Sequence, residues 1–289
     1  MQYRLLDCGE GEKLEQWGSY VTIRPEPHAR WPRSKPLAWW KEQAHWFFEQ
    51  GRGKGVPGRE DSGTWRQLKE APSLWTIDYK GLFKMRVGPM EYKHVGIFPE
   101  QAPNWDFIYN KIEAVKIKTA GVVPWVLNLF AYTGAASLAA KAAGAEVVHL
   151  DALRQMVSRS RENMDLSGLS GIRWVVEDAL TFVQREVRRG NTYHGIILDP
   201  PAFGHGPGGE RWKLQEDLPV LLEGCFRILD EKHGFLVLNV YAHGFTAEEA
   251  ARMVRKFFPG KGNITFGTLY LKDNYGKKLS AGIFSRLEL

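Results

Sequence analysis

The segment that decides the fold reads Val126-Leu127-Asn128-Leu129-Phe130-Ala131-Tyr132-Thr133-Gly134-Ala135-Ala136-Ser137. Its first half is an apolar run that predicts a buried strand, and its second half is a turn of small residues that opens a helix. Gly134 can adopt a positive φ and lets a ligand approach the backbone. The first turn of the helix offers unpaired N–H groups to an anion such as a carboxylate or phosphate. The segment therefore predicts a ligand-binding strand–turn–helix unit.

Strand-like and helix-like segments alternate around this unit. The predicted strands are 125–130, 146–150, 172–176, 193–198 and 234–241, and the predicted helices are 105–119, 135–143, 153–166, 179–189 and 214–229. Two further strands, 263–271 and 279–287, predict an antiparallel hairpin. Such alternation is typical of a parallel sheet covered on both faces, and nearly apolar central strands fit it. We predict an α/β fold: a Rossmann-like, doubly wound, mostly parallel sheet with an antiparallel C-terminal hairpin.

The beginning of the chain has a different texture. Seven of the eleven tryptophans lie within the first 75 residues, among short strand-like runs such as 19–23 and 81–86 that Pro and Gly interrupt. One helix candidate, 37–50, stands among them. We predict a small β-rich substrate-recognition domain with an inserted helix over residues 1–94, followed by a second domain over residues 95–289.

Composition narrows the class of protein. The chain has 289 residues, is 44% hydrophobic and carries 39 Lys+Arg against 33 Asp+Glu, a formal charge of +6. These values are typical of a globular protein and exclude a disordered, collagen-like or coiled-coil chain. No apolar run reaches the ~18 residues of a membrane helix, and the first residues carry charges where a signal peptide is apolar. With two cysteines and no metal-ligand spacing, we expect a cytoplasmic protein without a metal or membrane partner.

Acidic residues follow three predicted strands at their carboxyl ends, where parallel sheets bind ligands. Asp151 lies about 20 residues past the turn, at the position where doubly wound folds hydrogen-bond a ribose. Asp178 follows strand 172–176, and Asp199 precedes two prolines. Each has a plainer explanation, since Asp178 could cap the next helix and Pro-Pro could simply end a strand. The missing Gly-x-Gly-x-x-Gly argues against a dinucleotide and for a smaller nucleoside that bears a carboxylate.

Several motifs together point to a family. They are Val95-Gly96-Ile97-Phe98-Pro99-Glu100-Gln101-Ala102-Pro103-Asn104-Trp105, Asn128-Leu129-Phe130-Ala131-Tyr132-Thr133-Gly134, Leu150-Asp151-Ala152, Glu177-Asp178-Ala179, Asp199-Pro200-Pro201-Ala202-Phe203 and Gly276-Lys277-Lys278-Leu279-Ser280. From about Val95 to its end, the chain resembles class I S-adenosylmethionine-dependent methyltransferases, closest to the ribosomal RNA large-subunit methyltransferase-like group. The resemblance implies an enzyme that uses S-adenosylmethionine.

The resemblance also implies a role for each motif. The turn residues Phe130, Ala131, Tyr132, Thr133 and Gly134 would hold the methionine part of the cofactor, and Gln101 would close over its amino-acid end. Asp151, next to Ala152, would bind the ribose hydroxyls, and Asp178, next to Ala179, would bind the adenine amino group. Asp199 and Pro200 would line the methyl-transfer position and are the predicted catalytic residues. Carboxylates suit these partners because diols and amino groups are hydrogen-bond donors.

The residues that follow the predicted strand 234–241 indicate whether methyl transfer uses a cysteine nucleophile. Resembling enzymes that methylate a cytosine carbon carry a nucleophilic cysteine after this strand, and here no cysteine follows it. Cys225 lies upstream on a predicted helix among apolar residues, and we interpret it as a core residue. Tyr241 and His243 lie where substrate groups could enter, and His243 is a candidate base. We therefore expect methyl transfer without a covalent cysteine adduct.

A basic and aromatic stretch over residues 28–59 is the candidate RNA-binding segment. It holds seven Lys and Arg against two Glu, so 7 − 2 gives +5. The cations are Arg30, Arg33, Lys35, Lys41, Arg52, Lys54 and Arg59, and the aromatic residues are Trp31, Trp39, Trp40, Trp46 and Phe47. Single-stranded RNA is held by such a combination of cations and rings. The alternative is that Trp39, Trp46 and Phe47, at helical spacing, form a core stripe.

The sequence thus favours a methyltransferase that acts on a base in RNA, ribosomal RNA above all. The candidate substrate residues are Phe203, Tyr241, Trp31 and Arg33. Two alternatives remain open: methyl transfer to a small molecule or a protein, and a non-catalytic RNA-binding protein that keeps the fold.

Overall fold

The computed structural model describes residues 1–51, 62–90, 92–241, 244–260 and 262–289. Its backbone contacts divide the chain into two compact units. The first consists of Met1–Pro99 and Tyr270–Ser280, and the second of Glu100–Leu269 and Ala281–Leu289. The tip of the C-terminal hairpin therefore belongs to the first unit, and its base belongs to the second.

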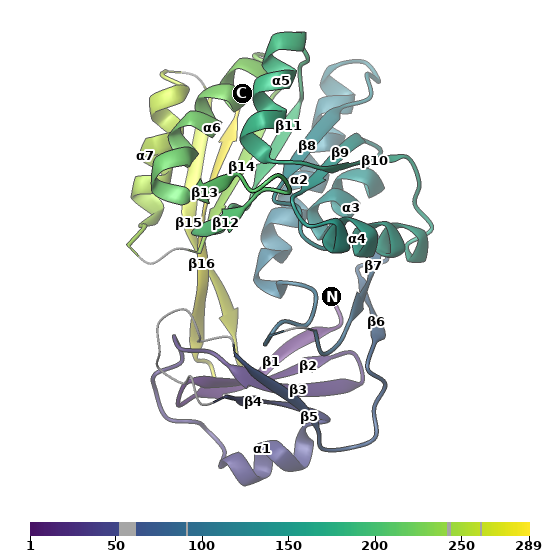
Figure 1. Cartoon of the computed structure of the whole chain (residues 1–289), viewed down its shortest axis with the longest axis vertical. Helices are drawn as coiled ribbons and strands as arrows, with labels where there is room; N and C mark the ends of the chain where they lie inside the picture. The colour runs from purple at the N-terminus through teal and green to yellow at the C-terminus, as the bar shows by residue number, and fades with distance from the viewer. Residues whose placement is uncertain (52–61, 91, 242–243, 261) are drawn as a thin grey trace. The chain divides into compact units, whose positions relative to one another are not determined.

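The second unit is built on a seven-stranded sheet with the strand order β10-β9-β8-β11-β14-β16-β15 (Figure 1). Its strands are β8 (Trp125–Leu129), β9 (Glu146–Asp151), β10 (Ile172–Val176), β11 (Gly195–Leu198), β14 (Phe235–Val240), β15 (Asn263–Lys272) and β16 (Lys278–Glu288). The first five strands in this order run parallel, and β16 pairs antiparallel with β14. The predicted mostly parallel sheet with an antiparallel C-terminal hairpin is confirmed.

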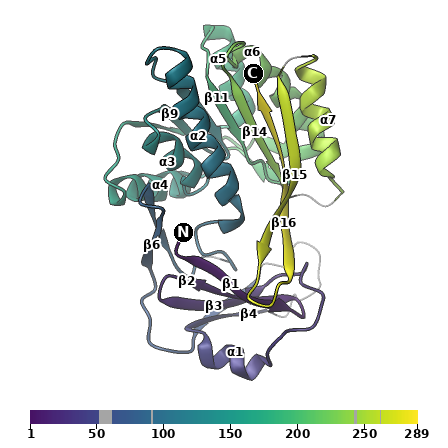
Figure 2. The ribbon, with the colours of Figure 1, turned by 180° about the vertical axis from the view of Figure 1, so that it is seen from behind.

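Helices cover both faces of this sheet. They are α2 (Ala102–Lys118), α3 (Ala135–Ala142), α4 (Arg154–Leu166), α5 (Ala179–Arg189), α6 (Leu214–Ile228) and α7 (Ala247–Phe257), preceded by the 3-10 turn η1 (Pro99–Gln101). Figure 1 views the sheet from the side of α5 and α6, and Figure 2 shows α2 on the opposite side. Coverage on both faces explains the apolar strands, since every residue of β11 and β14 is buried.

Three elements of this unit are absent from the predicted ones, namely one helix and the two strands of a short hairpin. Helix α7 begins with a capping box in which Thr246 and Glu249 bond to each other's backbone N–H groups, a signal that is visible in the sequence. The short strands β12 (Phe203–His205) and β13 (Arg211–Lys213) form a hairpin after the two prolines.

The register of the parallel strands brings their carboxyl ends to one edge of the sheet. Leu129 pairs with both Leu150 and Leu198, and Val176 pairs with Asp151. The segments that follow β8, β9, β10 and β11 therefore begin side by side. This edge carries the turn and the three acidic residues that the sequence singles out.

The first unit contains a five-stranded sheet with the order β1-β2-β3-β4-β5 and a separate β6–β7 hairpin. Its elements are β1 (Tyr3–Gly9), β2 (Glu12–Trp17), β3 (Tyr20–Pro25), α1 (Leu37–Gln43), β4 (Trp46–Gln50), β5 (Gly63–Gln67), β6 (Trp75–Tyr79) and β7 (Phe83–Val87). Trp17, Trp40 and Phe48 are its largest fully buried side chains. A β-rich N-terminal part of the chain is confirmed.

The predicted helix over 37–50 is wrong in its second half. Helix α1 ends at Gln43, and Ala44 is extended. The aromatic run that follows forms β4, which pairs parallel with β3 and antiparallel with β5. Aromatic residues favour strands, and two neighbouring strands supply the backbone bonds. Trp39, Trp46 and Phe47 therefore do not share a helical face, and the buried aromatic residues here are Trp40 and Phe48.

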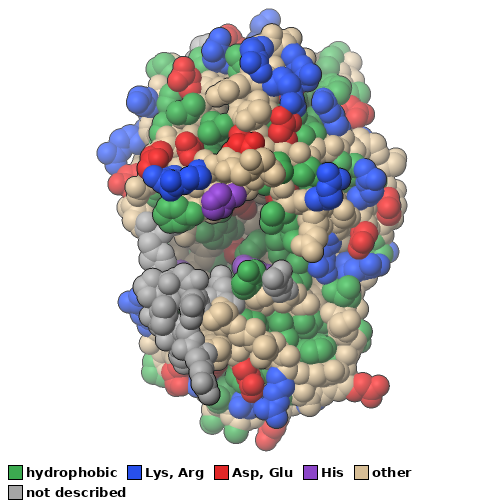
Figure 3. All heavy atoms as spheres, viewed as in Figure 1, with side chains coloured by type: hydrophobic (Ala, Val, Ile, Leu, Met, Phe, Trp, Pro, Cys, Tyr) green, Lys and Arg blue, Asp and Glu red, His purple; other side chains and the backbone are tan. Residues whose placement is uncertain are grey.

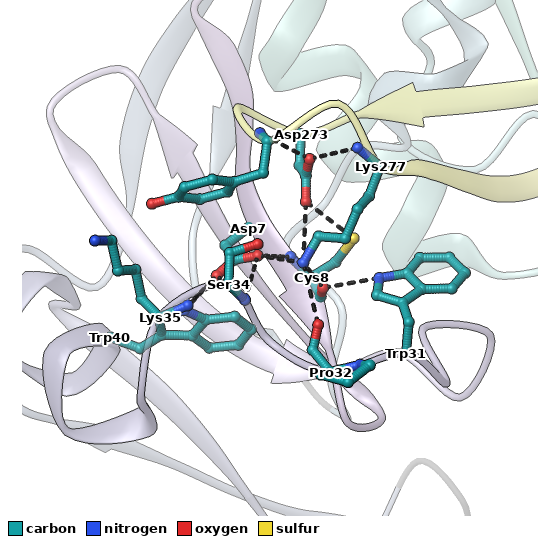
Figure 4. Close-up of polar contacts among 10 residues, drawn as sticks. Asp7, Cys8, Trp31, Pro32, Ser34, Lys35, Trp40, Asp273 and Lys277 are labelled. Atoms are coloured by element: carbon teal, nitrogen blue, oxygen red, sulfur yellow. Dashed lines mark hydrogen bonds and ion pairs between the residues drawn. The ribbon is translucent and has the colours of Figure 1, made fainter.

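A buried carboxylate, Asp7, ties the hairpin tip to the sheet of the first unit (Figure 4). Its oxygens accept from Lys277 Nζ at 2.6 Å and from Trp40 Nε1 at 3.1 Å, and also from the backbone N–H groups of Cys8, Ser34 and Lys35. Burial alone would raise the pKa of Asp7, but these donors outweigh it and the pKa is lowered. The carboxylate is thus ionised and joins segments 270 residues apart in the sequence.

No helix in the described part of the chain is long and apolar enough to span a membrane. Figure 3 shows one face of the molecule, on which acidic side chains lie among the Lys and Arg side chains. The net charge of +6 is therefore not gathered into a single uninterrupted basic patch on this face.

Candidate active site

The turn after β8 has an unusual backbone. Phe130, Tyr132 and Gly134 have φ values of 56°, 50° and 95°. Only glycine adopts such values without strain, and strained residues concentrate at functional sites. A Cβ on Gly134 would also lie 3.1 Å from the side chain of Ser160. The turn thus has both a conformation and a close contact that favour glycine at position 134.

Two side chains of helix α4 form hydrogen bonds to the backbone of this turn. Ser160 Oγ donates to the carbonyl oxygen of Tyr132 at 2.8 Å, and Asn163 Nδ2 donates to that of Thr133 at 3.0 Å. Ala131 N donates to the carbonyl oxygen of Leu150 in the neighbouring strand. Because two turn carbonyls are bound on the α4 side, the turn is held in one orientation. Ser160 and Asn163 are missing from the predicted site residues, and nothing in their sequence context marks them.

Asp151 is fixed by two backbone N–H groups. Its Oδ2 accepts from Tyr132 N at 2.8 Å and its Oδ1 accepts from Leu153 N at 2.9 Å, with Ala152 between them in the sequence. Burial raises the pKa of Asp151, and the two backbone bonds oppose that rise. The carboxylate therefore stands directly against the turn in a defined orientation, and each oxygen retains a lone pair for a ligand.

Asp178 is the N-cap of α5. Its Oδ1 accepts from Thr181 N at 2.8 Å, and Ala179 behind it is buried. The plainer explanation, helix capping, is therefore correct for one of its oxygens. A Cβ on Gly206 would lie 3.1 Å from the Cβ of Asp178, so the β12–β13 loop passes close to this carboxylate. A carboxylate can cap with one oxygen and bind a donor with the other.

Asp199 has a buried oxygen without a protein partner. Within the described residues, its Oδ1 accepts no hydrogen bond. Burial, and secondly the nearby carboxylate of Glu100, raise the pKa of Asp199 to about 8. The carboxyl is therefore largely protonated at neutral pH in the free protein. A buried polar group of this kind, at the carboxyl edge of a sheet, is typical of a site that binds a ligand.

Pro200, the next residue after Asp199, is buried. The hairpin that follows is anchored at its base. Trp212 Nε1 donates to the carbonyl oxygen of Pro201 at 2.7 Å, and its ring lies 4.8 Å from that of Phe130. Phe203 stands on β12 and is 77% exposed. The hairpin thus links the Pro-Pro segment to the turn and presents an aromatic side chain to solvent.

Gln101 and Tyr241 meet although 140 residues separate them. Gln101 Nε2 donates to the Tyr241 hydroxyl oxygen at 2.5 Å. The pKa of Tyr241 is raised, first by burial and then by the carboxyl groups of Asp199 and Glu100. Glu100 is a residue that sequence reasoning missed, although it stands beside Gln101 in the quoted motif.

Other predicted residues lie elsewhere. Trp31 and Arg33 belong to the first unit, where Trp31 Nε1 donates to the Cys8 carbonyl oxygen at 2.9 Å. The guanidinium of Arg33 bonds to Glu10 and Glu12, at 2.5 Å each, and lies over the ring of Trp40. Arg52, Lys54, Arg59 and His243 fall outside the described residues. Cys225 is fully buried in the apolar core and free, as predicted.

These groups fit S-adenosylmethionine. The turn offers backbone groups in a fixed, open conformation to the charged amino-acid end. Asp151 and Asp178 present carboxylate acceptors on neighbouring strand ends, as a ribose diol and an adenine amino group require. The unpartnered oxygen of Asp199 suits a positively charged ligand, because a cation would stabilise the carboxylate form.

Comparisons with known proteins agree with this geometry. A family model described as S-adenosylmethionine-dependent methyltransferase matches residues 69–229. The ribosomal RNA large subunit methyltransferase K/L of Shewanella frigidimarina (strain NCIMB 400) is 35% identical over 168 residues, which cover 57% of this chain and 22% of that protein. The chain therefore spans about a fifth of the length of this relative.

Solved structures extend the likeness over the whole chain. A SAM-dependent methyltransferase from Agrobacterium tumefaciens is 39% identical, with a TM-score of 0.90 over 100% of this chain and 90% of that one. The methyltransferase SMU.776, solved in complex with SAH, is 20% identical with a TM-score of 0.73 over 99% and 75% of the two chains, and shares the fold. With a family model that covers more than half of its residues, the chain belongs to the S-adenosylmethionine-dependent methyltransferases.

Proposed function

We propose that this methyltransferase acts on a base in RNA, with ribosomal RNA as the favoured class. The observation that carries the proposal is the match to relatives named ribosomal RNA large subunit methyltransferase K/L, at 35% identity over 168 residues. The positive net charge is consistent with a polyanionic substrate. Ribosomal RNA as the substrate would place the protein in the cytoplasm.

We propose the following arrangement for the cofactor, on the support of the geometry above. The turn of Phe130, Ala131, Tyr132, Thr133 and Gly134 holds the methionine part, and Gln101 closes over it. Asp151 and Ala152 take the ribose, and Asp178 and Ala179 take the adenine. These residues follow neighbouring strands at one edge of the sheet, and Asp151 accepts directly from the turn.

For the reaction itself, we propose that Asp199 and Pro200 border the position of methyl transfer. S-adenosylmethionine supplies a methyl group that its sulfonium already activates, so the protein mainly aligns the nucleophile. Pro200 stiffens the backbone beside Asp199. When the Asp199 carboxyl is ionised, it can accept a hydrogen from an attacking exocyclic amine, and a bound cation favours that ionised form. Cys225 is enclosed in the core and takes no part in this scheme.

The ribose assignment predicts a loss of cofactor affinity in Asp151→Asn. The amide keeps the size of the side chain and one acceptor, but it loses the charge that strengthens its bonds to hydroxyl donors. A hydrogen bond to a charged group is worth roughly 1.5–3 kcal/mol. We therefore expect S-adenosylmethionine to bind about 30-fold more weakly, as measured by isothermal titration calorimetry.

The exposed Asp165 on α4 provides the matched control, because Asp165→Asn makes the same chemical change away from the turn. This control should bind the cofactor as the wild type does. Equal affinity of the Asp151 variant and the wild type would refute the ribose assignment.

We further propose that residues 1–94 recognise the substrate. Phe203 and Tyr241 in the second unit, and Trp31 and Arg33 in the first, are the candidate contacts. The exposed ring of Phe203 supports stacking on an unpaired base, and an extruded base would follow if the RNA target is structured. The positive charge of Arg33 is balanced within its own unit by Glu10 and Glu12, so Phe203 is the better supported of these contacts.

The substrate class is tested by transfer of a tritiated methyl group. Purified protein and labelled S-adenosylmethionine are incubated with total RNA that lacks the endogenous modification, or with a protein extract. We expect label in the RNA fraction, and loss of that label in Asp199→Ala. Label in protein or small molecules alone would favour the second enzymatic alternative. Cofactor binding without transfer to any fraction would favour a non-catalytic RNA-binding protein.

A further inference from the structure

A groove lies between helices α6 and α7 of the second unit, which pack side by side (Figure 1). Its volume of about 510 Å³ falls within the range of roughly 300–1,000 Å³ that is typical of ligand sites. Its lining combines the apolar side chains of Phe245, Met253 and Phe257 with the cations of Arg252 and Lys256. The groove therefore offers both aromatic rings and positive charge to an occupant.

Two adjoining stripes of α7 supply most of this lining. Arg252 and Lys256 lie one helical turn apart, and Met253 and Phe257 form the neighbouring stripe. The apolar stripe is half-buried and, together with Phe245, packs against the core of the second unit. Lys256 Nζ lies 5.6 Å from the centre of the Phe257 ring. The core thus holds the rings in place, while the cations beside them are exposed.

The cations of α7 have no acidic partner in the part of the chain that the structure describes. No carboxylate there lies within ion-pairing distance of Arg252, Arg255 or Lys256. Lys213, which precedes α6, does pair with Glu216, at 2.6 Å. Like charges four residues apart destabilise a helix. An anion bound between Arg252 and Lys256 would relieve this repulsion.

Glu249 also lines the groove, but its carboxylate is engaged at the start of α7. Its Oε2 accepts from Thr246 N at 2.8 Å as part of the capping box. Arg252 lies about one turn further along the helix and forms no ion pair with Glu249. The two cations therefore outnumber the one carboxylate in the groove, and the helix already uses that carboxylate.

The groove begins at the edge of the sheet that carries the candidate active site. Phe245 follows β14 beyond its carboxyl end, and Gln215 lines the groove from the first turn of α6, after the hairpin that follows β11. Both helices therefore start at the carboxyl edge and run away from it. A polymer with its target residue at that edge can continue along the groove.

We propose that the groove between α6 and α7 binds a single-stranded segment of the RNA substrate next to the target nucleotide. Arg252 and Lys256 contact phosphates, and Phe245 and Phe257 stack on unpaired bases. The proposal rests on the proposed function, since it takes the substrate to be RNA. RNA suits the groove better than an acidic protein segment, because acidic side chains supply charge but no planar rings.

The test measures the affinity for a short labelled oligouridylate by fluorescence anisotropy over a series of KCl concentrations. Each phosphate contact of a single strand contributes about 0.7 to the slope of log K against log salt concentration. Arg252→Gln combined with Lys256→Gln should therefore lower this slope by about 1.4. Extrapolated from equal binding at ~1 M salt, this groove variant should bind the RNA about 25-fold more weakly at ~0.1 M.

Phe257→Leu separates stacking from charge. Leucine keeps an apolar contact with the core but removes the ring, so the affinity for the RNA should fall about tenfold. The slope against salt should stay at its wild-type value, because no phosphate contact is lost. Thermal unfolding checks the fold of each variant, and Phe245→Leu replaces Phe257→Leu if the latter does not fold.

Lys118→Gln combined with Arg188→Gln is the matched control. Both residues are exposed cations in the last turns of α2 and α5, which lead to the amino ends of β8 and β11. The control removes as much positive charge as the groove variant does, but at the opposite edge of the sheet. It should keep the wild-type slope and affinity.

Four results would overturn the proposal. They are a wild-type protein that does not bind the oligouridylate, a wild-type slope in the groove variant, a loss in the control equal to that in the groove variant, and an unchanged affinity in both folded phenylalanine variants. Polyglutamate added at an equal concentration of charge should not displace the RNA. Displacement would assign the groove to an acidic protein segment and would also count against the proposal.

The binding titration and the methyl-transfer assay can fail separately. If RNA is methylated while the groove variant keeps the wild-type slope, the groove assignment is wrong and the substrate class stands. If the oligouridylate binds as expected but no RNA accepts a methyl group, the methylation of RNA fails and the groove assignment stands. The affinity for S-adenosylmethionine should be unchanged in every variant, because none of the substituted residues belongs to the proposed cofactor site.

Discussion

Acid should destabilise this protein through His149 alone by about 2 kcal/mol at pH 5 and by about 4 kcal/mol at pH 3, relative to pH 7. The ring is fully buried in β9, and burial lowers its pKa from 6.5 to about 3. Its Nδ1 is hydrogen-bonded to Ser137 Oγ at 2.9 Å. Ser137 Oγ also accepts a hydrogen bond from Asn128 Nδ2 at 2.9 Å. This arrangement suits a neutral ring, because the serine hydrogen points at the ring nitrogen.

The sign follows from the protons that each state binds. Between pH 6.5 and about 3, the unfolded chain carries a proton on His149 and the folded chain does not. Unfolding therefore takes up one proton in this range, and stability falls as the pH falls. The stabilisation is complete above pH 6.5 and is gone below about pH 3. Asp199 acts in the opposite sense, because its raised pKa of about 8 keeps a proton on the folded chain.

Comparison of two proteins isolates the contribution of His149 from those of the other titrating groups. Urea unfolding at a series of pH values should show that the wild type takes up about one proton more than His149→Gln at pH 5. The exposed His205 provides the control, since His205→Gln removes a histidine that is not in the core. An identical pH dependence for the wild type and His149→Gln, both folded, would show that the buried ring does not resist protonation.

Replacement of Asp7 by alanine should cost about 3–5 kcal/mol of stability, because it removes a fully buried carboxylate that is the acceptor for five donors, among them the partly buried ammonium of Lys277. Asp7 satisfies five donors, among them Lys277 Nζ and the indole of Trp40 (Figure 4). In the variant, the ammonium of Lys277 keeps Asp273 at 3.4 Å and the Cys8 carbonyl oxygen, but it loses its shortest carboxylate contact. The hairpin tip should detach from its sheet first.

Urea unfolding followed by tryptophan fluorescence measures this loss, because seven of the eleven tryptophans lie in the first 75 residues. Glu10→Ala is the matched control: it breaks an ion pair with Arg33 on the same sheet, where the side chain of Glu10 is 55% exposed. Exposed pairs contribute about 0–1 kcal/mol, so this variant should remain near the wild type. If Asp7→Ala and Glu10→Ala both lose equally little stability, Asp7 does not anchor the hairpin tip.

Local patterns in the sequence predicted the turn of 130–134, the acidic residues after three strands and the apolar strands. The structure contains a turn at that place, and it contains these strands with the acidic residues at their ends. Strands buried on both faces must be apolar, and a parallel sheet must place its loops at one edge. The helix predicted over 37–50 failed at Trp46 because periodicity alone does not separate an aromatic strand from a helix. Its strand identity depends on β3 and β5, which are its neighbours in space and not in the sequence.

The residues of the candidate site also divide into those that local sequence patterns reveal and those that only the folded chain brings together. Asp151, Asp178 and Asp199 stand next to strand ends in the sequence, so counting along the chain finds them. Ser160 and Asn163 come from α4, and only the folded chain brings them to the carbonyl oxygens of the turn.

By itself, the sequence determined most of the order of strands and helices in the second unit, the turn after β8 and the acids at the sheet edge, because each depends on side chains within a few residues of one another. The tertiary structure alone decided which groups share hydrogens across long separations, such as Asp7 with Lys277 and Gln101 with Tyr241. It also decided the protonation of Asp199 and His149. Burial and neighbouring charges set those pKa values, and both exist only once the chain has folded.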